Sequence, residues 1–150
     1  MKTIFKMIQR IQSIFFLLCA GFFGGAFTVP FATTSKSITG IFSDQMYNLS
    51  DHIALQILAG LGIAFSLGAI FLYKNRKNQI KLGYVITTVA ILLPLIGILI
   101  YMNETKELSD FIVEDGIGIY LPIGTIITAI LATRFVKKDE QLVASMDRLR

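Results

Sequence analysis

Long apolar stretches alternate with short polar connections along the chain. Four stretches contain no charged residue, and they span residues 14–32, 53–73, 82–102 and 117–133. A helix needs about 20 apolar residues to cross the hydrocarbon core of a bilayer, with a range of about 17 to 25. Helices are the expected form because lipid offers backbone groups no hydrogen-bond partners. The pattern therefore predicts an all-α fold, in which a single integral membrane domain over residues 1–150 forms an up-down-up-down bundle of four transmembrane helices.

The first and fourth stretches each have a competing interpretation. The first follows basic residues, as the apolar core of a cleaved signal peptide would, but it exceeds the usual length of about 7 to 15 residues. No small-x-small cleavage site ends it, so a retained helix is favoured. The fourth is interrupted by Gly118, Pro122 and Gly124. Its insertion into lipid is marginal on its own and is expected to depend on packing against the other helices.

Composition and charge support the membrane interpretation and set an orientation. The chain is 54% hydrophobic and 16% charged, whereas a soluble domain is about 25% charged. Of the 14 Lys and Arg residues, only Lys36 and Lys106 fall in the first and third connections. The positive-inside rule then places both termini in the cytoplasm. The net charge of +4 comes from basic blocks beside apolar runs, so no nucleic-acid partner is expected.

Small residues recur at a spacing of four in three of the stretches. Residues four apart share a helix face, and small side chains there let two helix backbones approach closely. These stripes predict either packing within one bundle or the interface of a homo-oligomer. The candidates for helix packing are Gly21 and Gly25 in the first stretch, Gly60, Ala64 and Gly68 in the second, and Gly124, Thr128 and Ala132 in the fourth.

Residues with the potential for chemistry are sparse. The chain has one cysteine, Cys19, and one histidine, His52, so it cannot form an internal disulfide or a zinc site of four Cys and His ligands. None of the four stretches contains the Asp, Glu, Lys, Arg or His residues that mark ion pathways. No arrangement of Ser, His and Asp for nucleophilic catalysis stands out. We therefore expect no enzymatic activity, no catalytic residue, no cofactor and no metal.

Two predictions about function follow. The leading one is a non-enzymatic membrane component with an interaction, assembly or regulatory role. Its partners would be the lipid bilayer and either another membrane protein or a second copy of the chain. The alternative is a small channel or carrier with a polar passage around Pro94. The threonines that would line this passage are Thr87, Thr88, Thr125 and Thr128.

The last segment, residues 134–150, is predicted to be a cytoplasmic helical tail. Leu142, Met146 and Leu149 recur at helical spacing, which fits a helix that continues the fourth span or one that lies along the inner leaflet. The charged candidates for an interaction are Lys137, Lys138, Asp139, Glu140, Asp147, Arg148 and Arg150. In the first connection, polar and apolar residues alternate around residues 37–42, which indicates a small hairpin.

Both ends of the chain carry distinctive motifs. Residues 7–13 read MIQRIQS, and residues 131–150 read LATRFVKKDEQLVASMDRLR. Together they resemble a domain-of-unknown-function family of small bacterial membrane proteins with four predicted spans, over nearly the whole chain. The resemblance implies the same topology in a bacterial inner membrane, and it transfers no catalytic residue, because the family has no established activity. Its members tend to begin at the MIQRIQ element, which six residues precede here.

Overall fold

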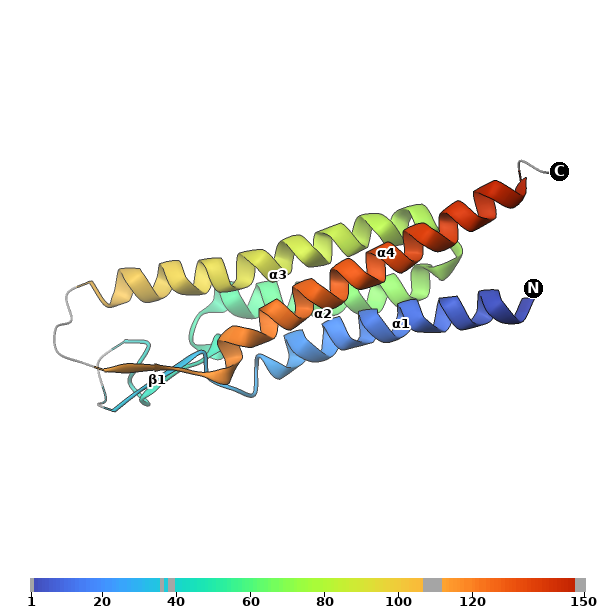
Figure 1. Cartoon of the computed structure of the whole chain (residues 1–150). Coiled ribbons are helices and arrows are strands. Elements are labelled where there is room, and N and C mark those ends of the chain that lie inside the picture. The colour runs from blue at the N-terminus through green and yellow to red at the C-terminus, as the bar shows by residue number, and fades with distance from the viewer. Residues whose placement is uncertain (1, 36, 38–39, 107–111, 148–150) are drawn as a thin grey trace.

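The computed structural model describes residues 2–35, 37, 40–106 and 112–147, and within these ranges the side chains from residue 11 to residue 145. Four long helices make up most of the chain (Figure 1): α1 (Lys2–Gly25), α2 (Ile53–Phe71), α3 (Arg76–Glu104) and α4 (Leu121–Asp147). Three short 3-10 helices accompany them: η1 (Leu49–Asp51), η2 (Leu72–Lys74) and η3 (Ile117–Tyr120).

The four helices pack into an elongated bundle in which consecutive helices run in opposite directions (Figure 1). α1 packs against α2 and α4, and α3 packs against the same two helices, so the four form a closed ring. One end of the bundle, called here the terminal end, holds the start of α1, the α2–α3 connection and the end of α4. The opposite end, called the sheet end, holds the two longer connections.

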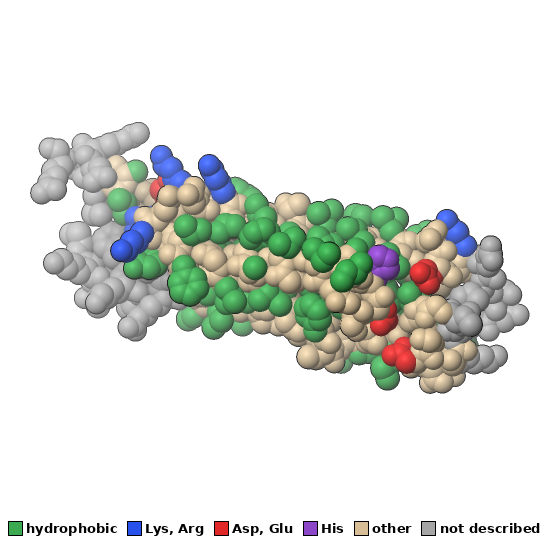
Figure 2. Space-filling view, turned by 180° about the vertical axis from the view of Figure 1, so that it is seen from behind, with side chains coloured by type: hydrophobic (Ala, Val, Ile, Leu, Met, Phe, Trp, Pro, Cys, Tyr) green, Lys and Arg blue, Asp and Glu red, His purple; other side chains and the backbone are tan. Residues whose placement is uncertain are grey.

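Three segments of the described chain are long and apolar enough to cross a membrane: Ile53–Lys74, Arg76–Glu104 and Ile117–Ser145. The apolar part of α1, Ile11–Gly25, is shorter. On the face shown in Figure 2, hydrophobic side chains cover the middle of the molecule and charged side chains gather towards its two ends. Soluble monomers rarely expose apolar patches larger than a few hundred Å². The chain is therefore an integral membrane protein.

The first predicted span ends earlier than expected. The prediction extended it to residue 32, but α1 ends at Gly25, which follows a second glycine at position 24. The backbone N–H and the hydroxyl of Thr28 both donate to the Gly25 carbonyl, at 2.9 Å and 2.8 Å. Glycine weakens a helix and readily closes it, and Pro30 cannot continue one. The apolar residues after Gly25 therefore leave the helix and lead into a strand.

The third predicted span begins earlier than expected. The prediction started it at residue 82 because charged residues precede that point, but α3 begins at Arg76. The side chain of Asn75 accepts the backbone N–H of Asn78 at 3.2 Å and so caps the helix. Gln79 is 1% exposed and donates through its side chain to the Ala69 carbonyl at 3.0 Å, which joins α3 to the end of α2. The first turns of α3 therefore belong to the packed bundle.

A small antiparallel sheet lies at the sheet end, with strand order β2-β1-β3. Its strands are β1 (Ala32–Thr34), β2 (Met46–Tyr47) and β3 (Val113–Asp115). β1 and β2 form the hairpin predicted for the first connection, although the strands lie on either side of residues 37–42. β3 belongs to the third connection and was not predicted. The chain is therefore mostly helical rather than all-α.

One glycine allows the two connections to meet. The backbone N–H of Gly116 donates to the Phe31 carbonyl at 2.9 Å. A Cβ atom at position 116 would collide with the carbonyl oxygen of Pro30. The contact therefore requires glycine, because no other residue leaves room for the neighbouring backbone.

The buried core extends along the bundle. Phe16, Cys19 and Phe23 of α1 are at most 1% exposed and pack among residues of the other helices. α1 therefore belongs to the folded bundle.

Tyr47 connects the sheet to α3. Its side chain is 3% exposed, and its hydroxyl donates to the Gly97 carbonyl at 3.0 Å. Burial, and after it the negative charges of Asp51 and Glu104, raises the pKa of Tyr47 to about 12. Both effects act in the same direction because each disfavours the phenolate. Tyr47 therefore stays neutral across the physiological range and keeps its donated hydrogen bond.

Candidate functional site

A buried ion pair lies at the terminal end of the bundle. The Nε atom of Arg76, at the start of α3, donates to Oδ2 of Asp139, on α4, at 2.8 Å. The Asp139 side chain is 2% exposed and that of Arg76 is 29% exposed. A buried carboxylate needs such a partner because desolvation otherwise costs several kcal/mol. The sequence analysis did not predict this pair, since it named Asp139 only as a charged candidate for an interaction of the tail.

Two buried oxygen atoms near the terminal end accept no hydrogen bond from the described residues. They are Oδ1 of Asp139 and Oε1 of Gln79. Buried polar atoms are usually paired, so each such atom is a feature to explain. Arg76 and Gln79 are one turn apart on α3, and Arg76 reaches Asp139. Each of these two oxygen atoms could therefore accept a hydrogen bond from a further donor.

The second half of α4 is attached to the bundle on two sides. Gln12 is 2% exposed and donates from Nε2 to the Phe135 carbonyl at 3.2 Å. The rings of Phe15 and Phe135 stack with centroids 5.4 Å apart, a geometry worth about 0.5 to 1.5 kcal/mol. On the α3 side, Lys137 lies over the ring of Tyr84, 5.0 Å from its centroid. α4 thus continues beyond residue 133 as one helix, as the first of the two tail predictions proposed.

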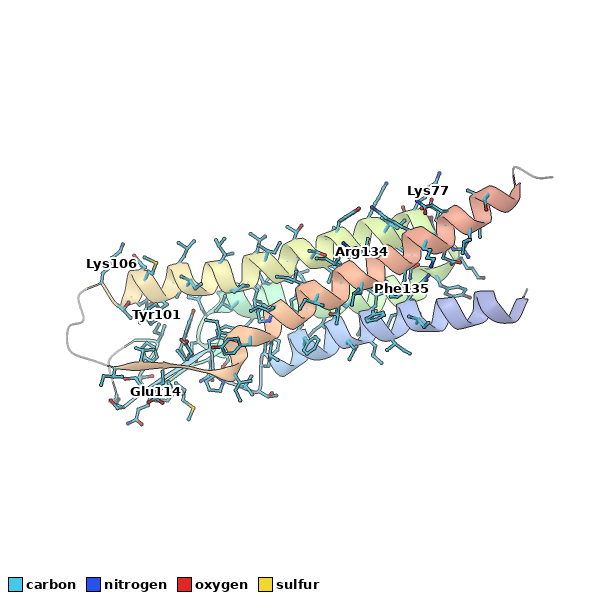
Figure 3. All side chains as sticks on the ribbon, in the orientation of Figure 1. Lys77, Tyr101, Lys106, Glu114, Arg134 and Phe135 are labelled. Atoms are coloured by element: carbon cyan, nitrogen blue, oxygen red, sulfur yellow. The ribbon has the colours of Figure 1, made fainter. Side chains whose placement is uncertain are left out.

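A groove lies between this part of α4 and the α2–α3 connection. Its volume is about 370 Å³. One wall carries positive charge from Lys74, Arg76 and Lys77, while the α4 wall presents Glu140 and small or apolar residues. Figure 3 shows Lys77 at the terminal end, far from Glu114 at the sheet end. The groove therefore combines a basic wall with a mixed wall.

The predicted tail candidates fall into different environments. Lys137 and Lys138 are exposed, Asp139 is buried, and Glu140 is half-buried in the groove. Asp147 is the last residue of α4, but its side chain lies outside the described part, as do Arg148 and Arg150. The structure therefore separates the buried Asp139, which holds the helix in place, from neighbours that face solvent or the groove.

The small residues predicted to pack divide into two groups. Gly124 lies against the ring of Phe22, Gly25 lies near Leu121, and Thr128 and Ala132 are buried. Gly21, Gly60 and Ala64 are exposed, and Gly68 is half-buried with open space where a Cβ would lie.

Two glycines outside the predicted stripes make closer contacts than the residues of those stripes. A Cβ at Gly62 would lie 2.6 Å from the Phe23 ring, and one at Gly83 would collide with the hydroxyl of Thr133. Both are buried where two helices meet. Ser66 and Thr87 lie four residues after these glycines, but spacing alone does not show which side chain of another helix a glycine meets.

The residues with potential for chemistry lie apart. Cys19 is buried, with its sulfur 3.2 Å from the Thr128 hydroxyl oxygen. His52 lies at the start of α2, where its Nδ1 accepts the backbone N–H of Ala54 at 3.3 Å. Among the described residues, no group of three or more His, Cys, Asp and Glu side chains lies close enough to hold a metal ion.

Comparison with known protein families identifies the family of the chain. Residues 8–149 match the model of a family described as Domain of unknown function (DUF4293). The chain belongs to this family. The DUF4293 match covers α2, α3 and α4 completely and most of α1, and it includes nearly all of both terminal motifs. No curated protein and no solved structure matches the chain. The molecular function of this DUF4293 protein is unknown.

Proposed function

We propose that this DUF4293 protein is a non-enzymatic component of the bacterial inner membrane that binds a partner protein through the groove at its terminal end. Both termini and the groove lie in the cytoplasm. The distribution of charge supports this orientation, because all but two of the 14 basic residues belong to the terminal end by sequence. The side chains of Tyr73 and Tyr84 also belong to this end and are exposed, as expected for residues at a membrane interface.

The dimensions of the helices agree with four crossings. α1 has 24 residues, which corresponds to about 36 Å at about 1.5 Å per residue. The hydrocarbon core of a bilayer is about 30 Å thick. The apolar part of α1, Ile11–Gly25, accounts for only about 22 Å of this length, so the proposed crossing also uses the uncharged residues 26–32 that follow the helix.

The observation that carries the proposal is the fixed position of α4 beside the basic α2–α3 connection. The Arg76–Asp139 ion pair and the contacts of Phe135 hold the helix against α3 and α1. The groove is consequently formed before any partner arrives. Preformed surfaces bind with a smaller loss of conformational entropy than flexible tails do.

The two walls of the groove indicate the chemistry of its partner. Lys74 and Lys77 offer positive charge, whereas Val143 and Ala144 offer apolar contact. An acidic, partly apolar peptide segment matches both walls, because its apolar side chains can lie against Val143 and Ala144 while its carboxylates reach the lysines; a lipid phosphate would match only the basic wall. A second copy in the same orientation carries most of its acidic residues at the opposite end. The favoured partner is therefore a different protein with an acidic cytoplasmic segment.

The positions of the threonines do not favour the alternative, a channel or carrier. The hydroxyls of Thr87, Thr88, Thr125 and Thr128 each donate to a carbonyl of their own helix, four residues earlier. Such bonds satisfy the hydroxyl locally and leave it less able to coordinate a permeating ion. Thr88 is exposed on the surface of the bundle, whereas Thr125 is 1% exposed in the core. The four side chains therefore do not line a common passage.

Site-specific photocrosslinking in native membranes tests the proposal. A photoreactive amino acid replaces Val143, which lines the groove, or Gln141, which is exposed and does not. We expect a discrete protein adduct from position 143 and not from position 141. Lys77→Glu should reduce that adduct by about tenfold or more, because like charges across an interface cost several kcal/mol. Lys81→Glu is the matched control, since Lys81 is exposed outside the groove.

Three results would count against this function. One is crosslinking only to lipid from position 143, which would assign the groove to headgroups. Another is an adduct that survives Lys77→Glu as well as it survives Lys81→Glu. The third is ion or solute flux into proteoliposomes that the purified protein alone supports, which would favour the channel or carrier.

A further inference from the structure

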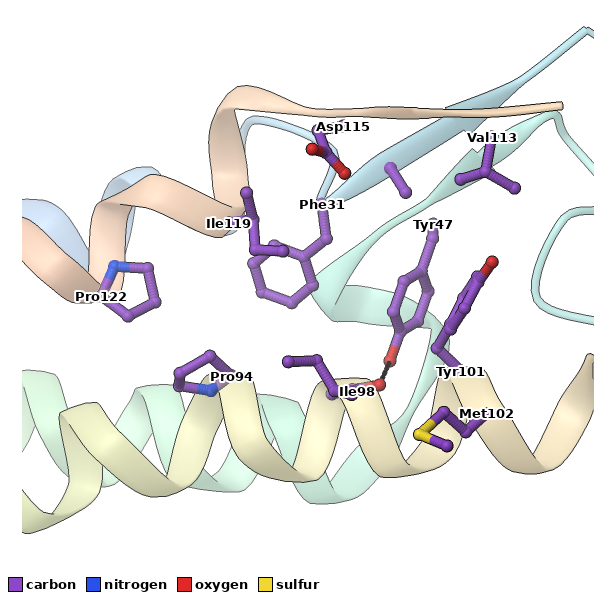
Figure 4. Close-up of a pocket in the computed structure, with 12 residues that line it drawn as sticks. Phe31, Tyr47, Pro94, Ile98, Tyr101, Met102, Val113, Asp115, Ile119 and Pro122 are labelled. Carbon is purple, nitrogen blue, oxygen red and sulfur yellow. Dashed lines mark hydrogen bonds between the residues drawn. The ribbon is translucent and has the colours of Figure 1, made fainter.

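An apolar pocket lies near the sheet end, between the second half of α3 and the start of α4. Its volume is about 350 Å³, within the range of about 300 to 1,000 Å³ of small-molecule sites. Figure 4 shows Pro94 and Pro122 facing each other across one part of the pocket, with Phe31, Tyr47 and Tyr101 in the rest. Pro94 lies inside α3 and Pro122 in the first turn of α4.

The pocket opens on the surface of the bundle. Ile98 and Met102 line it from α3, and their side chains are 48% and 56% exposed. Leu95 and Leu99, their neighbours on the same helix, are 49% and 56% exposed. The surface that contains the mouth of the pocket is therefore the one that contacts lipid in an integral membrane protein.

The walls are held in place without a ligand. The hydroxyl of Tyr47 donates to the Gly97 carbonyl, so the aromatic ring is fixed against α3. The Tyr47 ring also meets Phe31 edge to face, with centroids 5.8 Å apart. Because these contacts set the shape of the pocket in advance, an occupant would not have to pay for ordering it.

The charge at the rim of the pocket is negative. Asp115, on β3, is exposed and lines the outer edge of the pocket, and no Lys, Arg or His among the described residues lines it. The body is lined mainly by apolar and aromatic side chains. This combination suits an amphiphile with an apolar chain and a positively charged head, since opposite charges select between otherwise similar ligands.

We propose that this pocket binds a phospholipid whose headgroup carries a primary amine, with one acyl chain inserted between Pro94 and Pro122 and the amine near Asp115. The membrane supplies such a lipid directly at the mouth, between Ile98 and Met102. The assignment of this lipid to the outer leaflet rests on the proposed orientation. The chemistry of the pocket does not depend on that orientation or on the groove at the terminal end.

Photolabelling with defined lipids tests this proposal. The full-length protein is reconstituted into vesicles that contain phosphatidylethanolamine with a diazirine on one acyl chain, in both leaflets, so that the result does not depend on orientation. Phosphatidylglycerol with the same labelled chain is the comparison. After irradiation, mass spectrometry locates the labelled peptides. We expect labelling to concentrate on the pocket-lining segment of α3 around Ile98 and on residues 112–122, more strongly than elsewhere on the lipid-facing surface.

Two variants separate the apolar and charged parts of the site. Ile98→Trp fills the mouth and should reduce pocket labelling severalfold, while Leu95→Trp is the matched control with an equally exposed residue outside the pocket. Asp115→Asn should leave chain insertion intact but lower the preference for phosphatidylethanolamine over phosphatidylglycerol. The expected preference is about two- to fivefold, the range that one exposed ion pair supports.

Each outcome decides between the proposal and its rivals. Labelling spread evenly over the lipid-facing surface, or reduced equally by Ile98→Trp and Leu95→Trp, would overturn the site. Equal labelling by both lipids in the wild-type protein would overturn the assignment of an amine headgroup. Asp115 is exposed, so Asp115→Asn should fold even if Ile98→Trp does not, and the headgroup comparison can still refute the proposal.

Discussion

Removal of Arg76 should destabilise the bundle more than neutralisation of its partner. The Asp139 side chain is 2% exposed in the intact protein, and the Arg76→Ala substitution would leave neither of its carboxylate oxygens paired by a described residue. Loss of one partner of a buried ion pair typically costs about 3 to 5 kcal/mol, because an uncompensated charge remains buried. Asp139→Asn removes that charge, and Arg76, which is 29% exposed, can still reach water. Its expected cost is at most about 1.5 to 3 kcal/mol, the worth of a hydrogen bond to a charged group, because the asparagine amide oxygen can still accept from Arg76.

The double variant makes the test specific. Arg76→Ala combined with Asp139→Asn should be more stable than Arg76→Ala alone, because no charge then remains buried. The two substitutions would therefore be non-additive, as expected for groups in direct contact. Lys77→Ala is the control, since Lys77 is exposed beside Arg76 and its loss should change stability by no more than about 0.5 kcal/mol.

The assay is reversible unfolding of purified protein in mixed micelles by titration with sodium dodecyl sulfate, followed by far-ultraviolet circular dichroism. It gives the free energy of unfolding for the wild-type protein and the four variants under the same conditions. The reasoning would be refuted by an Arg76→Ala cost no larger than that of Lys77→Ala. It would also be refuted if the double variant lost the full sum of the two single costs.

Two further predictions concern packing and pH. Gly83→Ala should destabilise the protein by about 1 to 3 kcal/mol, because the added methyl group overpacks against Thr133. Gly60→Ala, whose methyl group meets open space, should be neutral or slightly stabilising in the same unfolding assay. Equal effects of the two substitutions would contradict the packing described here. The pKa of Tyr47 rises from 10.0 to about 12 on folding. The stabilisation that the neutral Tyr47 side chain gives the folded state is therefore complete below pH 10 and is lost as the pH rises to about 12. Tyr47→Phe should be less stable than wild type below pH 10, because the hydrogen bond to Gly97 is lost, and the difference in unfolding free energy should narrow at higher pH. A difference that stays constant in parallel unfolding titrations would contradict the raised pKa of Tyr47.

The helical part of the fold could be predicted because lipid imposes a simple rule on the sequence. A span must be apolar and must satisfy its own backbone. The absence of charge between residues 53 and 73 therefore placed the start of α2 correctly and its end within two residues. The rule fails at helix ends. α3 begins among charged residues because Asn75 caps it and Gln79 finds a partner on α2. α1 ends among apolar residues because Gly25 and Pro30 close it.

The features that distinguish this protein arise from long-range contacts that a single sequence does not display. Asp139 is one of several charges in a polar segment, and only the proximity of Arg76 makes it a buried ion pair. The third strand forms because Gly116 lets its segment approach the backbone at Pro30. The sheet-end pocket combines residues from two connections and two helices, so no local pattern identifies it. The periodicity of a sequence shows which residues share a helix face, but it does not show which helix faces pack against each other.

The groove and the pocket lie at opposite ends of the bundle and would face opposite sides of the membrane. The groove is basic and lies beside the terminal segment of α4, while the pocket is apolar with an acidic rim. Both assignments to a side of the membrane depend on the orientation of the whole chain. That orientation is therefore the central claim to test.

Cysteine accessibility tests the orientation most directly. In a Cys19→Ala background, Ser50→Cys places a thiol at the sheet end and Ser145→Cys places one at the terminal end; both serines are exposed in the fold. The account predicts that a membrane-impermeant maleimide labels Ser50→Cys in intact spheroplasts, and labels Ser145→Cys only after the membrane is opened. Labelling of Ser145→Cys in intact spheroplasts would contradict it, as would protection of Ser50→Cys until the membrane is opened.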